Sequence, residues 1–310
     1  MPGNWNHLKG PTFPWYPLLE ERIAQGDFPD LNGPVLSLYS DYAGADDRSD
    51  YSVICILALD IQKSKEWETR RQEVRSRFLP DNRRMSFKGL NDARCREAFF
   101  PFLDAANAIH GLCLSIAIEK SVKNLCTTDE AFQHYKPQLT GQWKLRDFEN
   151  MTRVTFFVAA VVAALSKPDQ DIYWISDHDA ILMNPRRQAD AIKMLGKWTG
   201  LYVPHPLGEV GAGTVAIDPG DHADEDLASI ADLVAGGVAE AVTAITRKGP
   251  LPPRHPITET FSLKTEFMNN WFMDSSQPLK RLGCLIQRHP SGQGFRVGTW
   301  KIDDAAEPSN

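Results

Sequence analysis

The sequence has few of the features that would place it outside the cell or in a membrane. The N-terminus lacks the basic segment and apolar run of a secretory signal, so we expect a cytoplasmic protein. The longest apolar run, 154–165, is too short to cross a bilayer, and no membrane span is expected. The cysteines are odd in number, widely spaced and without a Cys-x-x-Cys pair, so we expect neither disulfides nor a thiolate zinc site. They are Cys55, Cys95, Cys113, Cys126 and Cys284.

Several catalytic motifs are also absent. The glycine-rich stretch 208–213 lacks the Gly-Lys-Ser ending of a phosphate-binding loop, and no Gly-x-Ser-x-Gly elbow or His-x-x-x-His pair occurs. A net charge of −6 argues against a protein that coats nucleic acid indiscriminately, although a local basic groove is compatible with it. The 310 residues, 42% hydrophobic and 24% charged, are typical of a globular chain with a sizeable core.

The hydrophobic patterning predicts an α/β fold. Two β-type runs at 35–41 and 51–59 flank a turn-like segment and indicate a hairpin. Alternating strands and helices follow, which favours a mixed sheet covered by helices. Strands are expected at 111–120, 171–176 and 211–218, and helices at 64–78, 92–110, 146–166, 186–197 and 224–246.

The chain is predicted to have three parts. Residues 1–33 carry aromatics and prolines and are interpreted as an N-terminal extension lying across the domain. Residues 34–248 form the main domain. The proline-rich stretch that begins at Gly249 is typical of a boundary, so residues 249–310 are predicted to be a peripheral C-terminal appendage.

Carboxylates follow or face the predicted strands at several points. Asp41 comes directly after the first strand, Asp177 and Asp179 follow the strand at 172–176, and Asp232 lies inside the last helix. Mg²⁺ and Mn²⁺ prefer such oxygen ligands, and a two-metal phosphodiesterase site collects aspartates from different elements. Converging acids repel one another without a cation, so a purely structural role explains them poorly.

Each of these acids also has a simpler interpretation. Asp41 precedes a glycine and is a plausible turn residue, whereas Asp177 and Asp179 fit an Asx turn or a helix cap. Asp232 fits a solvent-facing acid, but its helix neighbours are small and would let the carboxylate approach the sheet closely. These neighbours are Ala228, Ser229, Ala235 and Gly236.

Basic residues outnumber acidic ones between 63 and 88. Such a cluster is able to hold a phosphate backbone, although a solvated helix face is the alternative. Lys88, beside Phe87 and Gly89 at an element boundary, is the member we single out. The cluster comprises Arg70, Arg71, Arg75, Arg77, Arg83, Arg84 and Lys88.

In motif order, residues 35–246 resemble the bacterial and phage family named domain of unknown function 3800 (DUF3800), which is regarded as ribonuclease-H-like. The matching segments are Ser40-Asp41-Tyr-Ala-Gly44, Ser86-Phe-Lys88-Gly, Ala216-Ile-Asp218-Pro and Ser229-Ile-Ala-Asp232-Leu-Val-Ala-Gly236. The resemblance implies a metal-dependent nuclease in which Asp41, Asp177 or Asp179, and Asp232 bind Mg²⁺ or Mn²⁺. It also implies that Lys88 lies near the substrate phosphate.

Two residues depart from the family pattern. Tyr42 replaces the usual Glu after the first Asp, and Ser229 replaces the usual Gln of the last motif. Either change indicates a degenerate site or ligands recruited from Asp46, Asp47, Asp179 or Asp218.

Three functions follow from these observations. The first hypothesis is a Mg²⁺- or Mn²⁺-dependent nuclease acting on RNA or DNA, with a role in a defence or toxin-like system. The second is a non-catalytic ribonuclease-H-like binding or scaffold module with a protein partner. The third is an enzyme that hydrolyses a small nucleotide.

Overall fold

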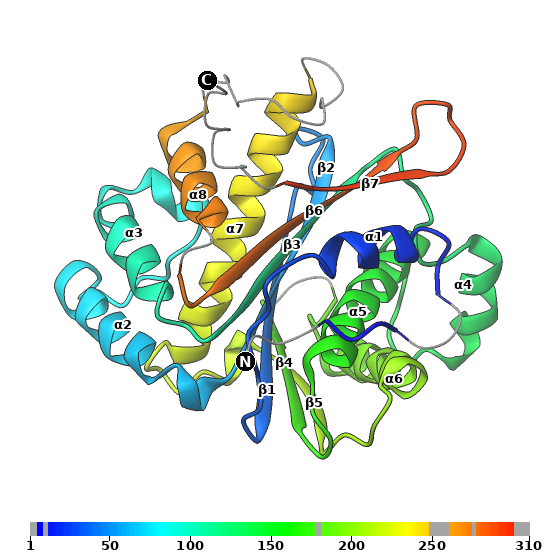
Figure 1. The fold of residues 1–310 in the computed structure, drawn as a ribbon, viewed down its shortest axis with the longest axis horizontal. Coiled ribbons are helices and arrows are strands. Elements are labelled where there is room, and N and C mark those ends of the chain that lie inside the picture. Colours follow the sequence, from blue (N-terminus) through cyan, green and yellow to red (C-terminus); the bar gives the residue numbers. More distant parts are fainter. Residues whose placement is uncertain (1–4, 9–11, 178–180, 248–260, 275–276, 301–310) are drawn as a thin grey trace, which may run out of the picture.

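A mixed seven-stranded sheet forms the centre of the molecule (Figure 1). The computed structural model describes residues 5–8, 12–177, 181–247, 261–274 and 277–300. The strand order is β5-β4-β1-β2-β3-β6-β7. The strands are β1 (Val35–Ala43), β2 (Tyr51–Leu59), β3 (Gly111–Glu119), β4 (Asp171–Ser176), β5 (Val210–Thr214), β6 (Lys280–Arg288) and β7 (Phe295–Trp300).

The first five strands have the arrangement of a ribonuclease-H-like sheet. The predicted hairpin is present, because β1 and β2 pair antiparallel, and β3 continues antiparallel to β2. Strand β4 pairs parallel to β1, and β5 pairs parallel to β4. This gives the order 3-2-1-4-5 with only β2 reversed, which confirms the predicted fold class.

Helices cover both faces of the sheet and enclose two separate cores (Figure 1). One face packs against α1 (Tyr16–Ile23), α5 (Leu145–Leu165) and α6 (Pro185–Tyr202), with α4 (Asp129–Tyr135) beside α5. The other face packs against α2 (Lys65–Phe78), α3 (Ala93–Ala106), α7 (Ala223–Thr246) and α8 (Leu263–Met273).

Helices α5 and α7 are both long and apolar enough to cross a membrane by length and composition alone. Most of each is enclosed by the fold, however, since 94% of the apolar window of α5 and 72% of that of α7 are buried. Burial between the sheet and the neighbouring helices therefore accounts for their apolar composition.

A buried ion-pair cluster fastens α2 to the start of α7. Asp226 is fully buried and accepts hydrogen bonds from Arg75 Nε and Nη2, both at 2.6 Å. Arg71 Nη1 donates to the same carboxylate at 3.1 Å. A buried carboxylate requires such partners, since removal of either partner leaves an uncompensated charge. Two members of the predicted basic cluster thus have a structural role.

The predicted C-terminal appendage requires correction. Strand β6 pairs parallel with β3 from Lys280 to Ile286, and β7 pairs antiparallel with β6. These strands of the segment 249–310 therefore belong to the central sheet, and Cys284 and Ile286 are fully buried in its core. The N-terminal segment also enters the core, where the rings of Trp15 and Tyr16 contact Phe156 of α5.

Candidate active site

Two of the predicted acids lie side by side on neighbouring strands. The parallel ladder between β1 and β4 ends with Ser40 opposite Ser176, so the next residues are Asp41 within β1 and Asp177 directly after β4. Asp41 belongs to β1, which continues for two residues beyond it, whereas we predicted that it would follow the strand. Because side chains alternate along a strand, Asp41 lies on the face of Tyr39, the face covered by α7.

Helix α7 contributes the third acid. Asp232 Oδ2 accepts a 2.6 Å hydrogen bond from the backbone N–H of Phe87, which belongs to the connection between α2 and α3. The small-residue face of α7 makes this contact possible: a Cβ atom at Gly236 would lie 2.4 Å from Cγ of Phe87. We predicted a close approach of Asp232 to the sheet, and the contact that the structure shows for its carboxylate is the hydrogen bond from Phe87.

The neighbouring acids affect the pKa values of Asp41 and Asp232. Burial raises the pKa of Asp41, and the charges of Asp232 and then Asp177 raise it further. Burial also raises the pKa of Asp232, against the hydrogen bond from Phe87 and the charge of Arg84. Such mutual effects are expected where carboxylates share a weakly solvated space.

Arg84 supplies the positive charge of this cluster. Its Nη1 atom lies 2.9 Å from Asp177 Oδ2, and its Nη2 atom lies 4.0 Å from Asp41 Oδ2. Burial lowers the pKa of the guanidinium, but the negative charges of three acids outweigh this effect and raise it. These acids are Asp177, Asp41 and Asp232. The sequence placed Arg84 in the basic cluster without distinguishing it from the other six members.

Asp41 has an incompletely satisfied carboxylate. Only 8% of the residue is exposed, and its Oδ1 accepts a hydrogen bond from the N–H of Tyr42 at 2.5 Å. The Oδ2 atom is buried and has no hydrogen-bond partner among the residues that the structure describes. A buried carboxylate oxygen without a donor is costly, so its position calls for a cation or a donor.

The donor chemistry of Asp41, Asp177 and Asp232 fits a hard divalent cation, which prefers carboxylate oxygens. Within the described residues, however, no three His, Cys, Asp or Glu side chains are arranged to hold one metal ion. Arg84 faces two of the three acids, so metal binding requires the guanidinium to move. Asp179 lies outside the described residues.

The residues considered as replacement ligands have other roles or lie elsewhere. Asp218 accepts hydrogen bonds from four backbone N–H groups at the start of α7. Asp46 is exposed and pairs with Arg48 at 2.6 Å, and Asp47 is exposed. Lys88 is also exposed and follows Phe87 directly, and its charge lowers the pKa of Asp232.

The structure places the two residues that depart from the pattern of the resemblance, Tyr42 and Ser229. The hydroxyl of Tyr42 contacts Ser40 Oγ at 2.7 Å and Ser176 Oγ at 3.2 Å, so the ring lies on the sheet face opposite Asp41. The side chain of an acid at position 42 would likewise leave the backbone on the sheet face opposite Asp41. Ser229 Oγ donates to the Glu225 carbonyl one turn earlier in α7.

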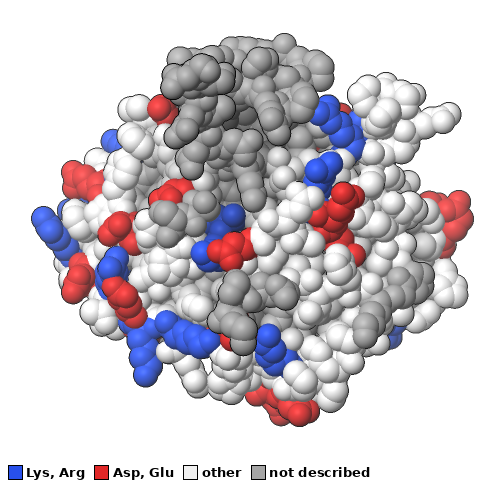
Figure 2. Space-filling model, in the orientation of Figure 1, with Lys and Arg blue, Asp and Glu red and all other residues white. Residues whose placement is uncertain are grey.

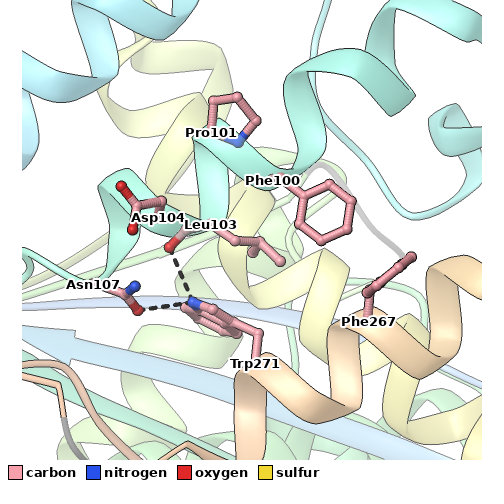
Figure 3. A pocket seen from close by; sticks show the side chains of 7 residues that line it. All are labelled: Phe100, Pro101, Leu103, Asp104, Asn107, Phe267 and Trp271. Atoms are coloured by element: carbon pink, nitrogen blue, oxygen red, sulfur yellow. Dashed lines mark hydrogen bonds between the residues drawn. The ribbon is translucent and has the colours of Figure 1, made fainter.

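A surface hollow lies elsewhere, between α3 and α8 (Figure 3). It has a volume of about 370 Å³ and is closed at one side by Trp271, whose Nε1 donates to Leu103 O at 3.0 Å and Asn107 Oδ1 at 2.8 Å. None of the predicted site residues lines it. The other lining residues are Phe100, Pro101, Asp104 and Phe267.

Comparisons with known proteins give little beyond this geometry. No protein-family model matches the chain, and no curated protein matches it. Among solved structures, the chain is similar to the crystal structure of the ribonuclease H2 from Pyrococcus horikoshii OT3, with 12% sequence identity and a TM-score of 0.36. The match covers 80% of this chain and 92% of that chain. A likeness at this level assigns neither a fold nor an activity, and the fold class rests on the strand order.

Proposed function

We propose that the protein is a Mg²⁺- or Mn²⁺-dependent phosphodiesterase that cleaves RNA or DNA. The observation that carries the proposal is the buried Oδ2 atom of Asp41, which has no hydrogen-bond partner in the described part of the chain and lies beside two further acids from different elements. Asp41, Asp177 and Asp232 would hold the ion, with Asp179 as a further candidate ligand. We also propose membership of the DUF3800 family, on the order of its motifs, and a cytoplasmic location.

The residues around the acids have roles that suit this reaction. A bound divalent ion would supply an activated water and stabilise charge on the leaving oxygen. The Phe87 N–H orients the carboxylate of Asp232 through its 2.6 Å hydrogen bond. Lys88, exposed at the next position, would pair with a substrate phosphate as a mobile point charge.

The charge distribution favours a local contact with nucleic acid over a broad one. Figure 2 shows acidic and basic side chains interspersed on the face in view, without a continuous basic area among the described residues. Most of the predicted basic cluster forms ion pairs with acids of the same chain, as in the buried pairs of Arg71 and Arg75 with Asp226 and the surface pair of Arg83 with Asp81. We therefore expect recognition to depend on the acid site and Lys88.

A second candidate function is a non-catalytic binding or scaffold module with a protein partner. The contact between Arg84 and Asp177 favours it, because a guanidinium that permanently neutralised the acids would make a metal unnecessary. The two candidates differ in whether a divalent ion binds at the three acids.

The test is cleavage of labelled single- and double-stranded RNA and DNA in Mg²⁺, Mn²⁺ or EDTA. We expect metal-dependent cleavage by the wild type and a loss of about a hundredfold or more in Asp41→Asn, Asp177→Asn and Asp232→Asn, since each removes a charged ligand. Asp46→Asn is the matched control, because it changes the same charge at an exposed acid. Full activity in all three variants would refute the assigned site. Wild-type inactivity on every substrate would favour the scaffold module.

A further inference from the structure

Arg84 reaches the acid cluster from the connection that links α2 to the short helix Lys88–Asn91. Its side chain is 27% exposed, and its two terminal nitrogens face different acids, Asp177 at 2.9 Å and Asp41 at 4.0 Å. The guanidinium therefore lies between acids that come from β1 and the end of β4, where a shared cation would also lie.

The guanidinium contacts the two acids unequally: Nη1 lies 2.9 and 3.0 Å from the two oxygens of Asp177, whereas the contact with Asp41 is too long for a hydrogen bond. The 4.0 Å separation is too long for a hydrogen bond to Asp41 Oδ2, and neither this oxygen nor the buried Arg84 Nε has a hydrogen-bond partner within the described residues. The same protein also contains a well-formed pair, in which Arg75 donates from two nitrogens to both oxygens of Asp226 at 2.6 Å. Bidentate geometry of that kind gives a guanidinium–carboxylate pair its strength. Arg84 balances charge in the cluster but leaves its hydrogen bonding incomplete.

We propose that the guanidinium of Arg84 occupies the cation position of the acid cluster in the metal-free protein, and that a divalent ion displaces it. The inference rests on the proposed function and adds a regulatory residue to that site. Two cations then compete for Asp41 and Asp177, so the apparent metal affinity is reduced by the fraction of molecules in which Arg84 fills the site. A purely structural role for Arg84 predicts the reverse, because loss of a supporting residue weakens a metal site.

The experiment is calorimetric titration of MnCl₂ into the full chain without nucleic acid. We expect Arg84→Ala to bind Mn²⁺ about tenfold or more tightly than the wild type, because the competing cation is gone. Arg84→Lys retains a charge without the planar fork and should fall between the two. Arg83→Ala is the matched control, because this substitution removes the same charge from the adjacent position. Arg83 itself pairs with Asp81 at 2.6 Å and with Asp92, away from the acid cluster.

A double variant shows where the ion binds. Asp41→Asn in the Arg84→Ala background should lose the added affinity, because the ion would need the Asp41 carboxylate. Thermal unfolding in EDTA verifies that each variant is folded before it is titrated. If Arg84→Ala is not folded, Arg84→Lys replaces it in the comparison with the wild type.

The outcomes separate this inference from the proposed function. Tighter binding in Arg84→Ala alone, or binding in that variant where the wild type has none, supports competition. Equal or weaker binding in Arg84→Ala, with a wild type that binds, overturns the competition and leaves the metal site intact. An absence of binding in both proteins overturns the competition and the proposed metal site together.

Discussion

At the residue scale, Asp218 stabilises the start of α7. Its Oδ2 accepts from the N–H groups of Asp224 and Glu225 at 3.0 and 3.1 Å, and its Oδ1 accepts from two further N–H groups. We expect Asp218→Ala to lower the free energy of unfolding by about 1 kcal/mol, the usual cost of losing a cap. Urea unfolding at pH 7 measures this effect, and Asp47→Ala, at an exposed acid, should change it little.

The same residue gives a pH dependence with a defined sign. Burial raises the pKa of Asp218, but hydrogen bonds from the backbone outweigh burial and leave the pKa below its ordinary value of 3.8. A carboxyl group with a depressed pKa stabilises the fold above its unfolded pKa and loses that effect as the pH falls through the folded pKa. The difference between wild type and Asp218→Ala should therefore shrink below about pH 4. A constant difference down to pH 2 would contradict a charged cap.

The positions of the candidate acids could be predicted from the sequence, but their partners could not. Asp41 and Asp177 lie near the carboxyl ends of β1 and β4, and the parallel pairing of these two strands brings the ends together. Arg84 was one of seven basic residues, and only the tertiary fold decides that it turns towards Asp177 while Arg75 turns towards Asp226. The unpartnered oxygen of Asp41 has no sequence signal, because it depends on burial by α7.

At the scale of elements, one glycine sets the distance between α7 and the connection that carries Phe87. A Cβ atom at Gly236 would lie 2.4 Å from Cγ of Phe87, which is closer than packed atoms allow. We expect Gly236→Ala to displace Phe87, weaken its hydrogen bond to Asp232 and cost about 1–3 kcal/mol of stability as an overpacked contact. Chemical unfolding measures the stability, and the Mn²⁺ titration measures the effect on the site.

Gly200→Ala is the control for this substitution. Gly200 lies inside α6, and an added Cβ atom there meets nothing within 4 Å. Alanine favours a helix interior over glycine by about 0.5–1 kcal/mol, so this variant should be as stable as the wild type or slightly more stable. If Gly236→Ala behaved in the same way, α7 and Phe87 would have room to separate without loss.

The main elements could be predicted because their periodicity is local. The helix predicted at 64–78 is α2, which occupies Lys65–Phe78. The helix predicted at 224–246 is α7, which occupies Ala223–Thr246. Strand β6 was missed because its apolar run is short and contains Gly283, and because its partner β3 lies more than 150 residues earlier in the chain. Parallel pairing over such a separation has no signature in a local window.

At the scale of the whole molecule, β6 covers an edge that would otherwise be exposed. Without it, β3 would present the unpaired backbone groups of Leu112–Ile118 along a strand rich in buried apolar residues. Such an edge is a template for association with other chains. Strand β6 therefore protects the sheet that carries Asp41, although none of the three candidate acids belongs to it.

Truncation distinguishes this role from that of a peripheral appendage. We expect residues 1–248 alone to aggregate or to unfold at a markedly lower temperature than the full chain, because β6, β7 and α8 are lost together with the buried Leu282, Cys284 and Ile286. Residues 1–300 form the control, since that chain retains every described strand and should unfold like the full protein. Size-exclusion chromatography and thermal unfolding measure both. A monomeric 1–248 fragment with the melting temperature of the full chain would show that residues 34–248 form an independent domain, and that β6 is dispensable for the sheet.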